Sequence, residues 1–147
     1  MDPKEIGSIC RQIPIFRGFN SDQTDNMLRV CEERTFQAGE YLFKEGDSST
    51  ELFILLSGHL QVLTSTGAEL ASIREMGVVG EMGVLTTQPR SAAAMAAQPS
   101  QMLSIRQADL LRLMDEDKGM GFKIYRNVTH ILCDRLRDSN ILLEQQS

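Results

Sequence analysis

Clustered basic side chains are absent from this chain of 147 residues. Its 15 lysines and arginines are outnumbered by 20 aspartates and glutamates, which leaves a net charge of -5. Domains that bind nucleic acid on their own usually present a clustered basic face. We therefore expect no direct contact with nucleic acid. The length fits one domain with a real hydrophobic core, so we interpret residues 1–147 as a single domain.

Long apolar runs are also missing. No stretch approaches the roughly 20 residues that a membrane-spanning helix needs. The N-terminal segment MDPKEIGSIC lacks the apolar region of a signal peptide. These absences predict a soluble, cytoplasmic protein with no membrane partner.

Cysteine and histidine are too scarce for most metal chemistry. The three cysteines, Cys10, Cys31 and Cys133, are widely separated, and no C-x-x-C pair occurs. This spacing indicates neither a disulfide framework nor a zinc site, and an iron–sulfur cluster would need about four cysteines. Haem bound through His59 or His130 stays open as a weaker alternative. We expect no metal, no cofactor and no catalytic residue, so the chain is not predicted to be an enzyme.

One segment, GEMGVLTTQPRSA from Gly80 to Ala92, combines an acid, a base and two glycines in apolar surroundings. Glycines allow backbone amides to approach an anion closely. The fork of Arg90 can bind a phosphate through two hydrogen bonds, and Glu81 can accept hydrogen bonds from hydroxyls. A ligand with a phosphate at one edge and a sugar hydroxyl at the other fits both groups. Taken singly, Glu81 could instead be a surface carboxylate with Arg90 as its ion-pair partner.

This segment resembles the phosphate-binding cassette of cyclic nucleotide-binding domains, roughly G-E-x-[AG]-[LV]-[LI] and then P-R-[ST]-A. The resemblance implies that Glu81 binds the sugar 2′-hydroxyl and that Arg90 binds the cyclic phosphate. The cassette amides would assist Arg90, and Ser91 would add a hydroxyl near the phosphate and base. The ligand-binding residues implied in this way are Gly80, Glu81, Met82, Gly83, Val84, Arg90, Ser91 and Ala92, with Val62 and Ala71 in the apolar wall.

Between residues 34 and 105 the chain reads as short strands separated by glycines. We take Gly39, Gly46, Gly58 and Gly67 as turn residues, with strands expected at 41–43, 52–56, 60–62, 92–96 and 102–105. The stretch GEYLFKEGDSSTELFILLSGHLQVL is similar to the framework of the same family. It implies an α+β, mainly β fold: an antiparallel jelly-roll-like β-barrel at 34–105, N-terminal helices at 1–33 and C-terminal helices at 106–147.

Helical patterns occupy both ends of the chain. A first helix is expected to end at Gln12, and Asn20 with Gln23 forms a weak capping box for a second. The last helix is expected from about Met120 to about Leu143. Arg135 and Arg137 alternate with Asp134 and Asp138 in the manner of a solvated face.

In the family, this last helix closes over the ligand, and in the catabolite-activator branch it also forms the dimer seam. The segment DRLRDSN, from Asp134 to Asn140, resembles that branch's base-contacting turn, which makes Ser139 and Asn140 candidate ligand contacts. Simple helix-end chemistry is an equal alternative for these two residues. For Val128 to Leu136, packing on the barrel of the same chain is preferred over a dimer seam.

The resemblance implies a non-catalytic sensor that binds a cyclic nucleotide, cyclic AMP in preference to cyclic GMP, and moves its C-terminal helix. The partners would be the nucleotide and an effector protein or domain, with a homodimer left open. No helix-turn-helix follows the last helix before Ser147, so we expect a lone sensor module, either natural or part of a longer transcription regulator. Two other interpretations remain: a scaffold that no longer binds nucleotide, and a metal-dependent cupin-like enzyme.

Overall fold

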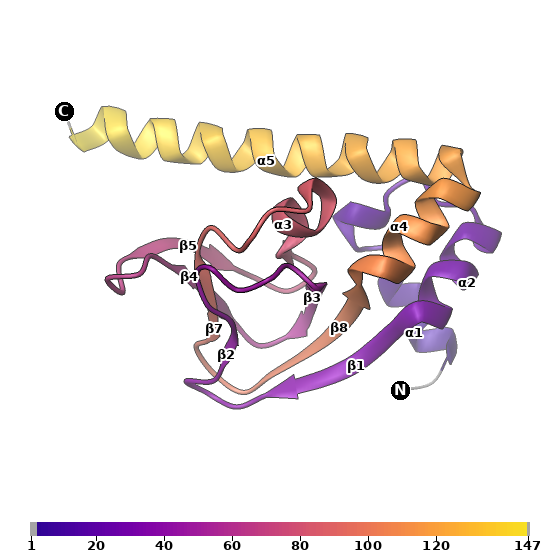
Figure 1. Cartoon of the computed structure of the whole chain (residues 1–147), viewed down its shortest axis with the longest axis horizontal. Helices are drawn as coiled ribbons and strands as arrows, with labels where there is room; N and C mark the ends of the chain where they lie inside the picture. Colours follow the sequence, from indigo (N-terminus) through magenta and orange to yellow (C-terminus); the bar gives the residue numbers. More distant parts are fainter. Residues whose placement is uncertain (1–2, 147) are drawn as a thin grey trace.

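The computed structural model describes the backbone of residues 3–146, and the side chains of residues 4–5 and 7–138. Two antiparallel four-stranded sheets face each other, with short helices at one end and one long helix along the molecule (Figure 1). This arrangement confirms the expected α+β jelly-roll-like fold. The first sheet has the order β1 (Cys31–Phe36), β8 (Ser100–Arg106), β3 (Glu51–Ser57) and β6 (Val78–Val79). The second has the order β2 (Tyr41–Phe43), β7 (Ala93–Ala96), β4 (Leu60–Leu63) and β5 (Glu69–Ile73).

Strand β3 divides the interior into two cores because successive side chains of a strand point to opposite faces. Phe53 and Leu55 lie between the two sheets, whereas Leu52 and Ile54 face the helices. All four are at most 1% exposed. A strand buried on both faces explains the unbroken apolar run in this part of the sequence.

The N-terminal part consists of α1 (Pro3–Cys10), a 3-10 turn at Pro14–Phe16 and α2 (Ser21–Val30). The predicted capping box of α2 is confirmed, since the Asn20 side chain accepts from the Gln23 amide and the Gln23 side chain accepts from the Asn20 amide. Helix α1 ends two residues earlier than expected, because the amides of Gln12 and Ile13 already form turns ahead of Pro14.

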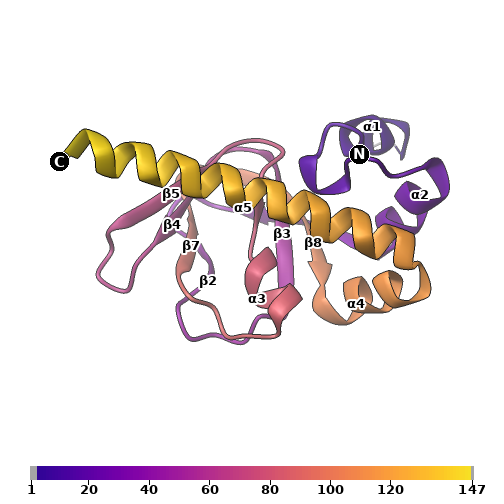
Figure 2. The same ribbon diagram turned by 90° about the horizontal axis from the view of Figure 1, so that it is seen from above.

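The C-terminal part consists of α4 (Gln107–Glu116) and α5 (Lys118–Gln146). Helix α5 runs along the whole molecule and crosses both the helical end and the sheets (Figure 2). Its inner side is held by Asn127, which is 4% exposed and donates to the carbonyls of Ile15 and Arg17 at 2.9 Å each. No helix among the described residues has the length and apolarity that crossing a membrane would require.

Asp117 caps the start of α5. One carboxylate oxygen accepts from the Met120 amide at 3.0 Å and the other from Gln23 Nε2 at 3.1 Å. These bonds, above all that from Met120, hold the pKa of Asp117 below its usual range. Because the folded-state pKa is the lower one, the carboxylate stabilises the fold at neutral pH. That contribution is lost as the pH falls below about 4 and through the folded-state pKa.

Asp117→Asn is therefore expected to make unfolding less sensitive to acid. Urea unfolding at about pH 7 and about pH 3 measures how far stability falls between the two, and the variant should lose less than the unaltered chain. Asp115→Asn is the control, because Asp115 lies nearby on α4 with a side chain that is 84% exposed. If both variants lost the same stability between the two pH values, the Asp117 carboxylate would not be the group that stabilises the fold at neutral pH.

Candidate functional site

The cassette is a short helix, α3 (Glu81–Thr86), entered from β6 through Gly80. Gly80 has a φ of +87°, a region that glycine adopts without strain. A Cβ atom at this position would lie 2.6 Å from Nη1 of Arg90. Gly80 is therefore needed both for the turn into α3 and for the approach of Arg90.

Ser49 holds the other side of the cassette. Its hydroxyl donates to the Gln88 carbonyl at 2.5 Å, and a Cβ atom on Gly83 would lie 2.0 Å from that hydroxyl oxygen. The sequence predicted close backbone approach at both glycines of the cassette. The described atoms nearest to these positions belong to side chains of the protein itself, Arg90 at Gly80 and Ser49 at Gly83.

Arg90 is buried, with 5% of its surface exposed. Nη1 donates to the Gly80 carbonyl at 2.9 Å, Nη2 donates to the Glu51 carbonyl, and the guanidinium lies 3.9 Å from the centre of the Phe43 ring. Its Nε–H has no acceptor among the described residues. Burial lowers the pKa of Arg90 and nearby carboxylates, Glu51 first, oppose this shift, so the group keeps its charge.

Glu81 is 2% exposed, and its ion-pair partner is Arg135 on α5. Nη1 of Arg135 lies 2.7 Å from Oε1 of Glu81, and Nη2 donates to the Val78 carbonyl at 2.6 Å. Figure 1 shows α5 passing over α3. Two interpretations from the sequence are thereby corrected: Arg90 is not the partner of Glu81, and Arg135 does not belong to a solvated face. The charge alternation around Arg135 concealed its contact with a residue 54 positions away.

A small cavity of about 90 Å³ joins these groups. It is lined by Phe43, Val62, Val79, Gly80, Glu81, Met82, Gly83, Arg90, Ser91, Ala92 and Arg135. Eight of the residues predicted from the sequence therefore meet here. Phe43, Val79 and Arg135 were not predicted.

The remaining predicted residues lie elsewhere. Ala71 is on β5 opposite Val62 and is not among the residues that line the cavity. Val84 is fully buried in the core beneath the helices, and its amide lies 3.4 Å from the Gly80 carbonyl. The side chains of Ser139 and Asn140 fall outside the described residues.

Arg135→Ala is expected to lower the free energy of unfolding by about 2 kcal/mol, because it leaves the buried Glu81 carboxylate without its charged donor. Urea unfolding measures the loss. Arg137→Ala is the matched control, since Arg137 lies on the same helix in an exposed pair with Asp134, and such pairs contribute little. Equal losses in the two variants would show that the Glu81 contact adds no stability.

One alternative from the sequence was a metal-dependent cupin-like enzyme. Among the described residues, no group of three or more histidines, cysteines and carboxylates is close enough to hold a metal ion. Burial raises the pKa of Cys10 to about 11 and that of Cys31 to about 12. Both thiols are therefore poor nucleophiles near neutral pH.

Residues 33–117 match the family model described as "Cyclic nucleotide-binding domain". This match covers more than half of the chain and includes the whole cassette. The chain belongs to the cyclic nucleotide-binding domain family.

Solved structures share the fold of this chain. This cyclic nucleotide-binding domain superposes on one from Methylobacillus flagellatus KT with a TM-score of 0.83 at 22% identity, covering 98% of this chain and 83% of that one. The catabolite activator protein of Thermus thermophilus gives a TM-score of 0.72 at 27% identity, covering 90% of this chain and 62% of that one.

Curated relatives are longer proteins. The domain is 30% identical over 140 residues to Glutaminase 1 of Bradyrhizobium diazoefficiens, covering 95% of this chain and 22% of that enzyme. It is 26% identical over 135 residues to the cyclic AMP receptor protein of Thermus thermophilus, covering 89% of this chain and 61% of that protein. The chain thus spans less than two thirds of the length of either relative.

Proposed function

We propose that this domain binds a cyclic nucleotide and acts as a non-catalytic sensor. The observation that carries the proposal is the buried Arg90, whose Nε–H lacks an acceptor beside the buried carboxylate of Glu81. A guanidinium has five N–H donors, and two of those on Arg90 are bonded to carbonyls. Three remain, and the Nε side of the fork can take two phosphate oxygens at once.

Glu81 would bind the sugar at the opposite edge of the cavity. Arg135 contacts Oε1 of Glu81, and we assign the second oxygen, Oε2, to the 2′-hydroxyl of the ribose. Val62 and Met82 would contact the sugar and base from the apolar side. Ser91 would donate its hydroxyl near the phosphate.

Binding requires the site to open. The cavity holds about 90 Å³, whereas pockets for small molecules measure roughly 300–1,000 Å³. Helix α5, attached to the site by Arg135, and the short helix α3 are the elements that cover it. We infer that the nucleotide enters as α5 shifts and that α5 settles in a different position over the bound ligand. Such a shift needs a ligand that binds the two positions with different affinity.

Cyclic AMP is the nucleotide we favour. The segment DRLRDSN resembles the base-contacting turn of the catabolite-activator branch, and a relative named cyclic AMP receptor protein matches most of this chain. Ser139 and Asn140 would contact the purine from α5. A serine at position 91 is compatible with either purine.

The output would be an effector protein or domain, as in relatives where a similar segment is part of a larger protein.

One partner that the sequence left open is a second copy of this chain. Phe122, Tyr125 and Leu136 are more than half exposed on α5, and their spacings of three and eleven residues place them on one side of the helix. The molecular mass in solution, from light scattering, tests this dimer directly.

Calorimetric titration with cyclic AMP and, separately, cyclic GMP tests the proposed function. Saturable binding of one molecule per chain, tighter for cyclic AMP, is the expected result. Tighter binding of cyclic GMP would overturn the base preference and keep the sensor. No binding of either nucleotide by a folded chain free of bound ligand would leave the scaffold interpretation.

A further inference from the structure

We propose that Arg34 is a positioning residue for Arg90, the arginine assigned to the phosphate. Arg34 lies on β1, at the opposite edge of the first sheet from β6, the strand that leads into α3, and it does not line the cavity described above. The inference rests on the proposed function in one respect: it supposes that the geometry of Arg90 determines nucleotide affinity. Two routes of contact connect the arginines.

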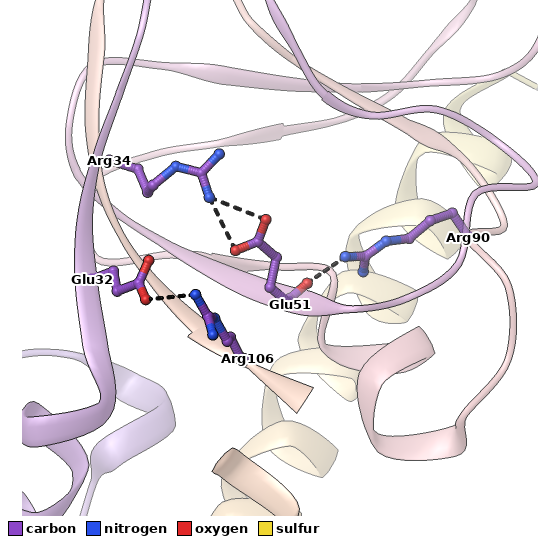
Figure 3. Close-up of polar contacts among 5 residues, drawn as sticks. All are labelled: Glu32, Arg34, Glu51, Arg90 and Arg106. Atoms are coloured by element: carbon purple, nitrogen blue, oxygen red, sulfur yellow. Dashed lines mark hydrogen bonds and ion pairs between the residues drawn. The ribbon is translucent and has the colours of Figure 1, made fainter. Parts of the chain in front are cut away.

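The first route passes through Glu51, at the start of β3. Nη1 of Arg34 lies 3.1 Å from both carboxylate oxygens of Glu51, while the backbone carbonyl of Glu51 accepts from Nη2 of Arg90. Figure 3 shows Glu51 between the guanidinium groups of Arg34 and Arg90. The Glu51 side chain is 23% exposed, so this pair is better shielded from water than an ordinary surface pair.

The second route passes through aromatic rings between the sheets. The Arg34 guanidinium lies 5.7 Å from the centre of the Phe53 ring, and Phe53 stacks on Phe43 with 6.3 Å between centres. Arg90 lies on Phe43. Cations on ring faces and stacked ring pairs are both favourable arrangements. The two arginines are therefore connected by a series of contacts through two stacked rings.

A neighbouring ion pair provides a matched control. Arg106 and Glu32 line one groove together with Arg34 and Glu51, and their side chains are 3.1 Å apart (Figure 3). Their side chains are 67% and 53% exposed, and neither contacts Arg90 in the described structure. Arg106 lies opposite Glu51 in the β3–β8 ladder, but its side-chain ion pair is with Glu32. Arg106→Ala therefore removes the same charge from the same sheet and leaves the Arg34–Glu51 ion pair in place.

The affinity test uses the full chain and whichever of cyclic AMP and cyclic GMP binds more tightly. Arg34→Ala should weaken binding about fivefold, as expected for residues of one network, and Arg106→Ala should change it less than twofold. Arg34→Lys, which keeps the charge, should recover part of the loss. In an Arg90→Lys background, Arg34→Ala should have little further effect. Unchanged affinity of Arg34→Ala, or the same loss in both backgrounds, would overturn the proposal.

A readout without ligand separates this inference from the proposed function. The Nε–H signal of Arg90 in a nitrogen-15 NMR spectrum is assigned by its disappearance in Arg90→Lys. It should shift in Arg34→Ala and stay in place in Arg106→Ala. If neither nucleotide binds but the signal shifts as expected, the proposed ligand fails and the positioning role stands. If nucleotide binds and the signal is unmoved in Arg34→Ala, only the positioning role fails.

Discussion

Arg90→Ala is expected to weaken cyclic nucleotide binding at least about 30-fold. Hydrogen bonds to charged groups contribute about 1.5–3 kcal/mol each, so a loss of at least about 2 kcal/mol corresponds to this factor. The reason is specific to the site: the three N–H groups of Arg90 not bonded to carbonyls include the buried Nε–H. Calorimetric titration of the variant beside the unaltered chain measures the change.

Two further variants show what the loss means. Arg90→Lys keeps the charge without the fork, so its affinity should fall between those of Arg90→Ala and the unaltered chain. Arg74→Ala removes an exposed arginine on the turn after β5, and it should leave binding unchanged. Unchanged affinity in Arg90→Ala would refute the assignment of the phosphate to this cavity.

Gly58→Ala is expected to cost about 3 kcal/mol of folding free energy, the largest stability effect predicted here. Gly58 has a φ of +114°, and a Cβ atom would lie 2.7 Å from Cα of Ser100. A non-glycine residue in a left-handed conformation costs about 1–2 kcal/mol, and overpacking adds about 1–3 kcal/mol. Urea unfolding of the variant measures the sum.

Gly67→Ala separates the two contributions. Gly67 also has a positive φ, +87°, but a Cβ atom there would meet nothing within 4 Å. Its substitution should cost only the conformational part, about 1 kcal/mol. If the two variants lose the same stability, crowding against Ser100 contributes nothing and the packing argument for Gly58 is wrong.

The parts of the molecule that the sequence predicted are those with a local signal. The Asn20 capping box lies within four residues, the strands are separated by glycines, and the cassette carries its glutamate and arginine within eleven residues. Strand β1 had no such signal, because CEERTF is polar on the side that faces solvent. The position of β1 in the sheet follows from its pairing with β8, some 70 positions away in the sequence.

Gly58 and Arg135 illustrate the same limit at single residues. Gly58 was interpreted as a turn residue, which its positive φ supports, but its contact with Ser100 depends on a strand that follows 40 positions later. Arg135 sits in a charge pattern that is indistinguishable from a solvated helix face. Only the path of α5 over α3 brings it to Glu81, and a single sequence contains no record of that path.

Asn127 and Arg135 attach α5 to the rest of the molecule at two points, and the distance between these points affects how far the C-terminal end of the helix can move. Asn127 is bound to the N-terminal segment, and Arg135 reaches the cavity eight residues later, about 12 Å along the helix axis. Gln146 lies nineteen residues beyond Asn127, about 28 Å along the same axis. If the helix turns as a rigid rod about Asn127, its far end moves more than twice as far as Arg135. A displacement of an ångström or two at the cavity would thus be geometrically amplified at the end of α5.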